Sequence, residues 1–244
     1  MRGDKEKECL ETVKLIFNCC KGSYWYGVSE DNKRHLMQKV NEASENPESN
    51  DFPDFIFDSG FIEHFQITSS KETRKGAKQI KRDKQDEAQL QKGVERAIQS
   101  GYQGIVRNLS YFVSGHNYEN LEYSFKKNFE NHIDSLRKWD GNQEIGIFLI
   151  EYTDMALNMG ECLTFEQNDG TRISEVMYDY YLSRDNNLLE YLQQYKSEIK
   201  FVIFKNSEVV EIIDVSKVEE IIKMQNEYLI LPVHGISSSY AVGI

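Results

Sequence analysis

A continuous apolar run from Gly146 to Tyr152 constrains the fold of this chain more than any other segment. Strands that are buried on both faces of a sheet have sequences of this kind, whereas half-exposed strands alternate apolar and polar residues. A second run, Lys200 to Phe204, follows later in the chain. Two buried strands with helical sequence between them predict an α/β fold with a mixed sheet.

Periodicity places the other elements. Helices are predicted at 5–20, 73–100, 118–139, 185–195 and 216–225, and further strands at 23–28, 53–58, 61–68 and 208–215. Residues 153–172 are predicted to be irregular, and the chain after Tyr228 extended. At 244 residues the chain fits a single domain, with a helical insertion expected around 101–140.

Composition argues against a membrane protein. No apolar run approaches the roughly 20 residues that span a bilayer. The first residues are charged and lack the apolar core of a signal peptide, so we expect a cytoplasmic protein. The four cysteines show neither CxxC pairing nor zinc-site spacing, and buried free thiols are expected rather than a metal or redox site.

Charge is distributed unevenly along the chain. The net charge of −11 opposes general attraction to nucleic acid. A basic strip nevertheless follows the second strand of the hairpin predicted at 53–68, and two acidic residues there oppose seven basic ones. An acidic body with one basic strip suits a protein that contacts phosphates at one place. The residues expected to contact DNA are Lys71, Arg74, Lys75, Lys78, Lys81 and Arg82.

The hairpin itself combines strand and polar signals. Pro53-Asp54 opens an apolar strand, Asp58 to Gly60 forms a turn, and polar side chains interrupt the second strand. This arrangement resembles the core of the PD-(D/E)xK nuclease superfamily, in which an Asp begins one strand and a (D/E)xK pair follows on the next. The resemblance implies a three-layer α/β/α, restriction-endonuclease-like fold.

The motif can be placed on the second strand in two phases, which differ in the residues that take its acid and lysine positions. His64 and Gln66 share one face, so they match the acid and lysine positions, while Glu63 points to the other face. A β-bulge could instead bring Glu63 round to pair with Gln66. Both phases stay open, and in both the motif lysine is missing. Lys71 or Lys75 would have to replace it.

Two other carboxylate positions are candidates. Glu6 lies on the face of the first predicted helix that should meet the sheet, and it could be a metal ligand like Asp54 and Glu63. It could equally be a first-turn Glu favoured by the helix dipole. Glu151 and Asp154 could form a second acidic site, although a strand end emerging into solvent is the simpler interpretation.

The resemblance implies an Mg²⁺- or Mn²⁺-dependent deoxyribonuclease with Asp54, Glu63, His64 and Gln66 as catalytic candidates. It also implies a setting in bacterial restriction or anti-phage defence, with an ATPase or helicase partner or self-association. The missing lysine favours an alternative: a nuclease-fold subunit without catalysis that binds nucleic acid or assembles with other proteins. Residues 101–145 and 153–195 have no functional interpretation.

Overall fold

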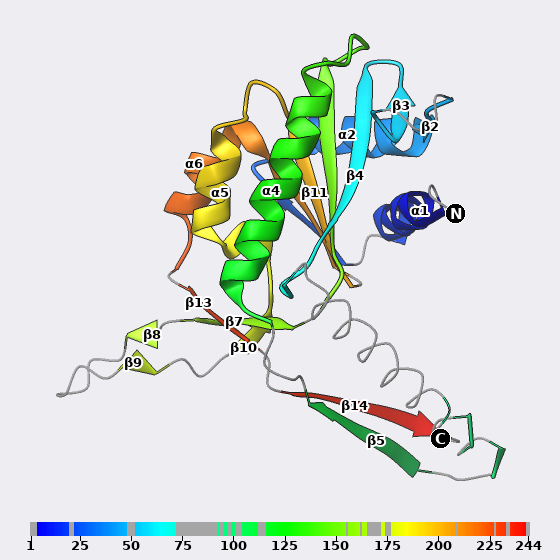
Figure 1. The fold of residues 1–244 in the computed structure, drawn as a ribbon, viewed down its shortest axis with the longest axis vertical. Helices are drawn as coiled ribbons and strands as arrows, with labels where there is room; N and C mark the ends of the chain where they lie inside the picture. The colour runs from blue at the N-terminus through cyan, green and yellow to red at the C-terminus, as the bar shows by residue number, and fades with distance from the viewer. Residues whose placement is uncertain are drawn as a thin grey trace.

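A seven-stranded mixed sheet forms the centre of the structure, which is a computed structural model (Figure 1). In spatial order its strands are β1 (Ser23–Tyr26), β12 (Val209–Asp214), β11 (Phe201–Asn206), β6 (Ile145–Tyr152), β4 (Gly60–Ile67), β3 (Phe55–Phe57) and β2 (Ser44–Glu45). The structure describes residues 4–19, 22–47, 52–71, 92, 95–96, 99–100, 104–111, 116–154, 156–161, 163–164, 172–173, 177–207, 209–226, 228–232 and 235–242.

The three central strands run parallel. β6 lies between β4 and β11 and pairs in parallel with both, which confirms the two buried strands expected from the apolar runs. β3 is antiparallel to β4, so the predicted hairpin is present. Parallel strands bring their carboxyl ends to one edge of a sheet, and that edge is where α/β proteins bind ligands.

Helices cover both faces of this sheet, which makes three layers (Figure 1). One face carries α1 (Asp4–Cys19) and α2 (Glu30–Glu42). The other carries α4 (Tyr118–Leu136), α5 (Asn186–Gln193) and α6 (Val218–Lys223), with short 3₁₀ turns at Leu182–Arg184 and Val215–Lys217. The expected α/β class is confirmed. Among the described helices, none is long and apolar enough to cross a membrane.

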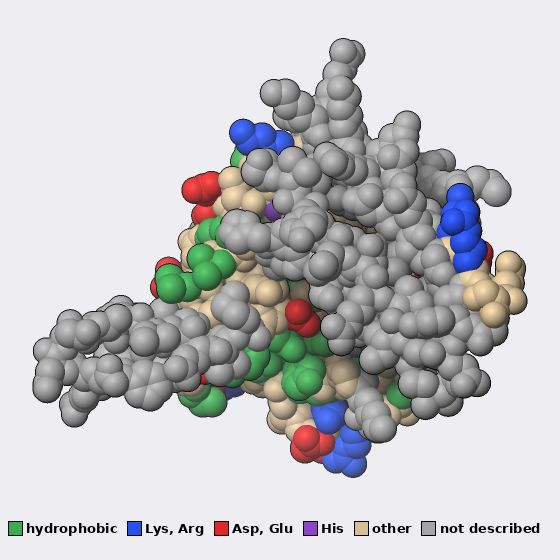
Figure 2. Space-filling view, turned by 90° about the horizontal axis from the view of Figure 1, so that it is seen from below, with side chains coloured by type: hydrophobic (Ala, Val, Ile, Leu, Met, Phe, Trp, Pro, Cys, Tyr) green, Lys and Arg blue, Asp and Glu red, His purple; other side chains and the backbone are tan. Residues whose placement is uncertain are grey.

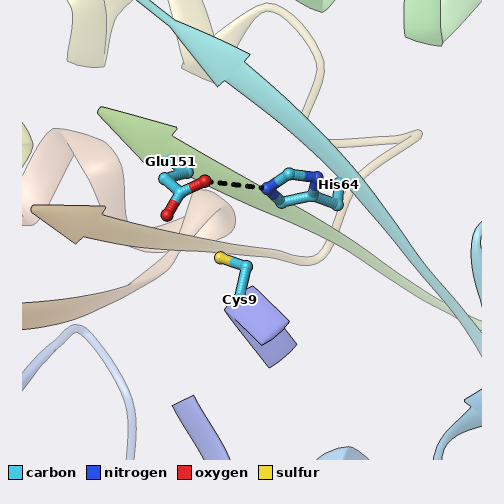
Figure 3. A group of neighbouring side chains, drawn as sticks. All are labelled: Cys9, His64 and Glu151. Carbon is cyan, nitrogen blue, oxygen red and sulfur yellow. Dashed lines mark ion pairs between the residues drawn. The ribbon is translucent and has the colours of Figure 1, made fainter. Parts of the chain in front are cut away.

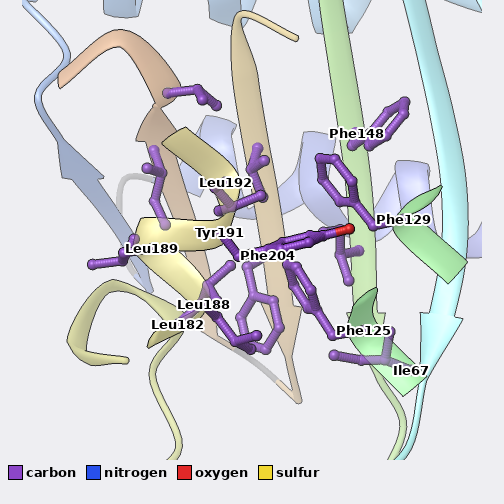
Figure 4. Packing of buried hydrophobic residues seen from close by; sticks show 14 of the residues in the cluster. Ile67, Phe125, Phe129, Phe148, Leu182, Leu188, Leu189, Tyr191, Leu192 and Phe204 are labelled. Atoms are coloured by element: carbon purple, nitrogen blue, oxygen red, sulfur yellow. The ribbon is translucent and has the colours of Figure 1, made fainter. Parts of the chain in front are cut away.

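The core residues explain why these helices form. In α1, the buried residues Leu10, Val13 and Phe17 recur at helical spacing and face the sheet. The Asn117 side chain caps the first turn of α4 by accepting a hydrogen bond from the Asn120 N–H. The apolar stripe of α4 packs with α5 and the sheet in an aromatic-rich core (Figure 4), which includes Phe125, Phe129, Phe148, Tyr191 and Phe204.

Smaller sheets of two or three strands lie outside the central sheet. They are β10 (Met177–Asp179), β7 (Leu157–Glu161) and β13 (Tyr228–Pro232) in one sheet, β5 (Gly104–Tyr111) with β14 (Gly235–Val242), and β8 (Leu163–Thr164) with β9 (Arg172–Ile173). Within the range of the helical insertion expected around 101–140, α4 is a helix but β5 is a strand. Residues 153–172 are likewise not wholly irregular, because β7 lies within them. Both strands pair with segments far away in sequence, which local periodicity does not reveal.

Candidate functional site

Three polar residues, Gln66, Glu151 and Lys205, stand side by side across the central sheet. Gln66 on β4 and Lys205 on β11 are both in register with Glu151 on β6. Because side chains alternate along strands, all three lie on the face that packs against α1, near the carboxyl ends of the parallel strands. Gln66 Nε2 donates a 2.7 Å hydrogen bond to Glu151 Oε2, and Lys205 Nζ lies 2.9 Å from Oε1. We call these residues the polar row.

One face of α1 lies over the polar row. An open pocket of about 240 Å³ lies between them, lined on the helix side by Lys5, Glu8, Cys9 and Thr12. These four residues have the spacing i, i+3, i+4 and i+7, which places them on one helix face. Glu8 is exposed to solvent, and it also contributes to the pocket wall. The pocket therefore has two carboxylates and two ammonium groups in its lining.

His64 and Cys9 approach Glu151 from neighbouring elements (Figure 3). His64 lies two residues before Gln66 on the same face of β4, and its Nε2 is 3.5 Å from Glu151 Oε2. Cys9 projects from α1 toward both residues (Figure 3) and is buried, as predicted from the sequence, whereas Cys19 at the end of α1 is exposed, contrary to that prediction. The pKa of the Cys9 thiol is raised to about 12, mainly by burial and also by the charge of Glu151.

Glu151 is held in its ionised form. Burial by itself would raise its pKa, but polar contacts from His64, Lys205 and Gln66 lower it to about 2. Such a carboxylate stays charged at neutral pH and is a poor proton acceptor. It is better suited to hold a cation or to orient other groups.

Glu63 lies on the opposite face of the sheet. The register of β4 with both neighbours is continuous, so no bulge turns Glu63 toward Gln66. One Glu63 oxygen accepts a 2.9 Å hydrogen bond from the Asp54 N–H, and the other lies 2.6 Å from Nδ1 of His132 on α4. The His132 ring stacks on Phe65. The structure therefore brings His64 and Gln66 together and separates Glu63 from them.

Asp54 immediately precedes β3 and contacts both Glu63 and His64 on β4. Its carboxylate accepts a 2.8 Å hydrogen bond from the backbone N–H of His64. The pKa of Asp54 is raised to about 6, mainly by burial and also by the nearby charge of Glu63, while the hydrogen bond from the His64 N–H opposes the shift. Asp54 does not line the pocket; its link to Glu151 runs through His64, whose N–H it binds and whose ring lies beside Glu151.

The other predicted residues have mixed outcomes. Glu6 is half-buried on α1, and its charge contributes to the raised pKa of Asp54, but it does not line the pocket. Lys71 is exposed. On the face in Figure 2, the basic side chains of the described residues are scattered rather than gathered. The rest of the predicted strip lies outside the described residues: Arg74, Lys75, Lys78, Lys81 and Arg82.

A second polar cluster joins the ends of β4 and β6. Asp154 accepts hydrogen bonds from the Ser69 N–H and hydroxyl, and its Oδ2 lies 2.9 Å from Nδ1 of His116. The Ser69 hydroxyl contacts that same nitrogen at 2.8 Å. In a Ser-His-Asp triad the serine and aspartate contact opposite ring nitrogens, so these residues cannot relay a proton in that way. Asp154 holds the ends of β4 and β6 together through these contacts and does not form an acidic site with Glu151.

The ligand atoms that converge here do not fit the expected Mg²⁺. Among the residues that the structure describes, one group of metal-binding side chains has ligand atoms within 4.8 Å of one another: Cys9, His64 and Glu151. Mg²⁺ takes oxygen ligands and is not bound by thiols. The sulfur and nitrogen ligands match a transition metal instead.

Glu151 and Lys205 are the site residues that sequence reasoning undervalued or missed. Each is a single charge near the end of an otherwise apolar strand, and that pattern was the available signal.

Comparisons with family models, curated proteins and solved structures found no match for this chain.

Proposed function

We propose that this protein hydrolyses phosphodiester bonds in DNA at the pocket between α1 and the polar row, with a divalent metal as cofactor. The observation that carries the proposal is the register of Gln66, Glu151 and Lys205 across three parallel strands. Together with His64 they supply a carboxylate, a histidine, an amide and an ammonium group beside one pocket. This set resembles the catalytic residues of the PD-(D/E)xK motif, except that the acid and the lysine come from the neighbouring strands β6 and β11 instead of from β4.

Lys205 replaces the missing motif lysine in this proposal. Gln66 occupies the lysine position of the hairpin motif, and Lys205 lies two strands away in the same row. An ammonium group in a partly dry pocket stabilises negative charge that develops on phosphate oxygens in the transition state. Lys71 and Lys75 are then not required for this role.

Two carboxylates with separated pKa values support a division of roles. The pKa of Glu151 is about 2, so this residue is a permanent anion in the pocket. The pKa of Asp54 is about 6, but Asp54 does not line the pocket, so its role is to hold the His64 backbone in place rather than to take a proton from the attacking water. In the proposed reaction, water attacks phosphorus and loses a proton to solvent, the bond from phosphorus to the leaving oxygen breaks, and the leaving oxygen takes up a proton from solvent. His64 lies between the two carboxylates: its ring is next to Glu151, and its backbone N–H donates a hydrogen bond to Asp54.

The test is cleavage of linear, circular and branched DNA with Mg²⁺, Mn²⁺ or Zn²⁺. We expect metal-dependent cleavage that falls about 100-fold or more in Glu151→Gln and in Lys205→Met. The chain offers matched controls at the opposite ends of the same strands, where Glu144 and Lys200 are exposed. Glu144→Gln and Lys200→Met should cleave like the native protein, and equal losses in the controls would count against the polar row.

A second candidate is a nuclease-like subunit that binds nucleic acid without cutting it. Both oxygens of Glu151 already accept hydrogen bonds, from Gln66 and Lys205, as in a purely structural ion pair. In that case DNA binding would be salt-dependent, and no metal would support cleavage of any substrate.

A further inference from the structure

The site holds three potential metal ligands from three different elements. Cys9 comes from α1, His64 from β4 and Glu151 from β6, and their ligand atoms all lie within 4.8 Å of one another. Cys9 and His64 are buried, and Glu151 is half-buried beside the pocket. Folding therefore brings together a sulfur, a nitrogen and an oxygen ligand that lie far apart in sequence.

The environment of His64 points to a missing ligand. Its side chain is only 3% exposed, and among the described residues Nε2 has no hydrogen-bond partner. A buried polar atom without a partner destabilises the folded state, so this nitrogen needs an explanation. Its nearest charged atom is Glu151 Oε2, yet the 3.5 Å separation is long for a charge-assisted hydrogen bond.

That separation matches two ligands that share one ion. Tetrahedral zinc with N and O ligands at about 2.0–2.2 Å keeps those atoms about 3.4 Å apart. The 3.5 Å distance from His64 Nε2 to Glu151 Oε2 is close to this value. A metal between these atoms would satisfy the buried imidazole nitrogen without moving either strand.

The remaining surroundings are those of a catalytic rather than a closed structural site. Three protein ligands leave one tetrahedral position open, as in catalytic zinc sites. The pocket of about 240 Å³ adjoins Cys9 and Glu151, so water or substrate can reach that position. Gln66 and Lys205 hydrogen-bond to the Glu151 carboxylate and would orient it as outer partners.

We propose that Cys9, His64 and Glu151 bind one divalent transition-metal ion of the zinc class rather than Mg²⁺. The Cys9 thiol releases its proton to solvent as the metal–sulfur bond forms. This proposal deepens the proposed function by naming its metal, but it rests on the geometry alone. Metal binding can be measured without any cleavage, so failure of one proposal is distinguishable from failure of the other.

The experiment is titration of the metal-free protein with Co²⁺, followed by absorption spectroscopy, and then competition with Zn²⁺. We expect one ion per chain, a thiolate-to-cobalt charge-transfer band, and displacement of Co²⁺ by Zn²⁺. Cys9→Ser should abolish the band, and His64→Gln and Glu151→Gln should each weaken Zn²⁺ binding about 100-fold or more. Cys19→Ser is the matched control, since Cys19 lies on the same helix and is exposed.

Thermal unfolding in metal-free buffer shows whether each variant is folded. Cys9→Ala serves as a second variant if Cys9→Ser unfolds, because alanine removes the ligand without placing a hydroxyl in the core. The inference would be overturned by cobalt binding that keeps its band in Cys9→Ser, or by a native protein that binds no Co²⁺ or Zn²⁺. Mg²⁺-supported cleavage in a protein that binds no Zn²⁺ would overturn it and leave the proposed nuclease standing.

Discussion

The ammonium group of Lys205 lies 2.9 Å from the carboxylate of Glu151, and this ion pair joins two parallel strands at the pocket. The two side chains are only 13% and 17% exposed, so solvent screens the pair weakly. The pair lies beneath α1 and contributes to both the stability and the electrostatics of the pocket.

Removal of the Lys205 charge should destabilise the protein. Lys205→Met keeps most of the side-chain volume but leaves the Glu151 carboxylate without its cation. We expect the free energy of unfolding to fall by about 1–3 kcal/mol, because an uncompensated charge remains partly buried. Urea denaturation measures this change. Lys200→Met, on the exposed end of the same strand, should change stability by no more than about 0.5 kcal/mol.

Glu151 should make the protein lose stability in acid. Its pKa is about 2 in the folded protein and 4.5 in an unperturbed chain, so the folded state favours the ionised form. The resulting stabilisation is complete above pH about 4.5 and is lost as the pH falls toward 2. Glu151→Gln should lack this loss, so its unfolding free energy should change less than that of the native protein between those values. Parallel acid slopes in native protein and variant would contradict the assignment.

Asp54 should have the opposite effect. Its pKa is raised to about 6 from 3.8, so ionisation is costly in the folded state, and the native protein gains stability as the pH falls through 6. Asp54→Asn keeps an oxygen that can accept the His64 N–H and removes the charge beside Glu63. We expect this variant to be more stable at pH 7 by at most about 3 kcal/mol. Denaturation at pH 4 is the internal control, because the difference should be much smaller there.

His132 should stabilise the buried Glu63 carboxylate. His132→Ala removes a contact of 2.6 Å to Glu63 and the ring that stacks on Phe65. We expect a loss of about 1–3 kcal/mol from these two interactions. A double-mutant cycle with Glu63→Gln measures the coupling between the two residues. Additive effects in that cycle would show that the pair does not interact.

Much of the fold was predictable because its signals are local. The apolar runs at 146–152 and 200–204 did become buried parallel strands, and the stripe of α4 did face the sheet. The alternation of β4 also held, so His64 and Gln66 share one face. In contrast, β5 and β7 were missed because they pair with β14 and β13, which come near the end of the chain.

The site was less predictable than the fold. The polar row depends on the register between strands that lie far apart in sequence, and local patterns do not encode register. Cys9 looked like an ordinary core cysteine, since its position on the apolar stripe of α1 does not reveal that His64 and Glu151 lie opposite. Glu63 matched the motif acid by residue type, but uninterrupted alternation places it on the α4 face.

The most direct test compares Glu151→Gln with Glu63→Gln in one assay of DNA cleavage, with stability measured on the same samples. The two residues lie on opposite faces of the sheet: Glu63 is an acid candidate of the hairpin motif, and Glu151 is the carboxylate of the polar row. We predict that Glu151→Gln stays folded and loses cleavage, while Glu63→Gln loses stability and keeps its cleavage rate per folded molecule. Cleavage that survives in Glu151→Gln but disappears in folded Glu63→Gln would contradict the account and place the chemistry on the α4 face.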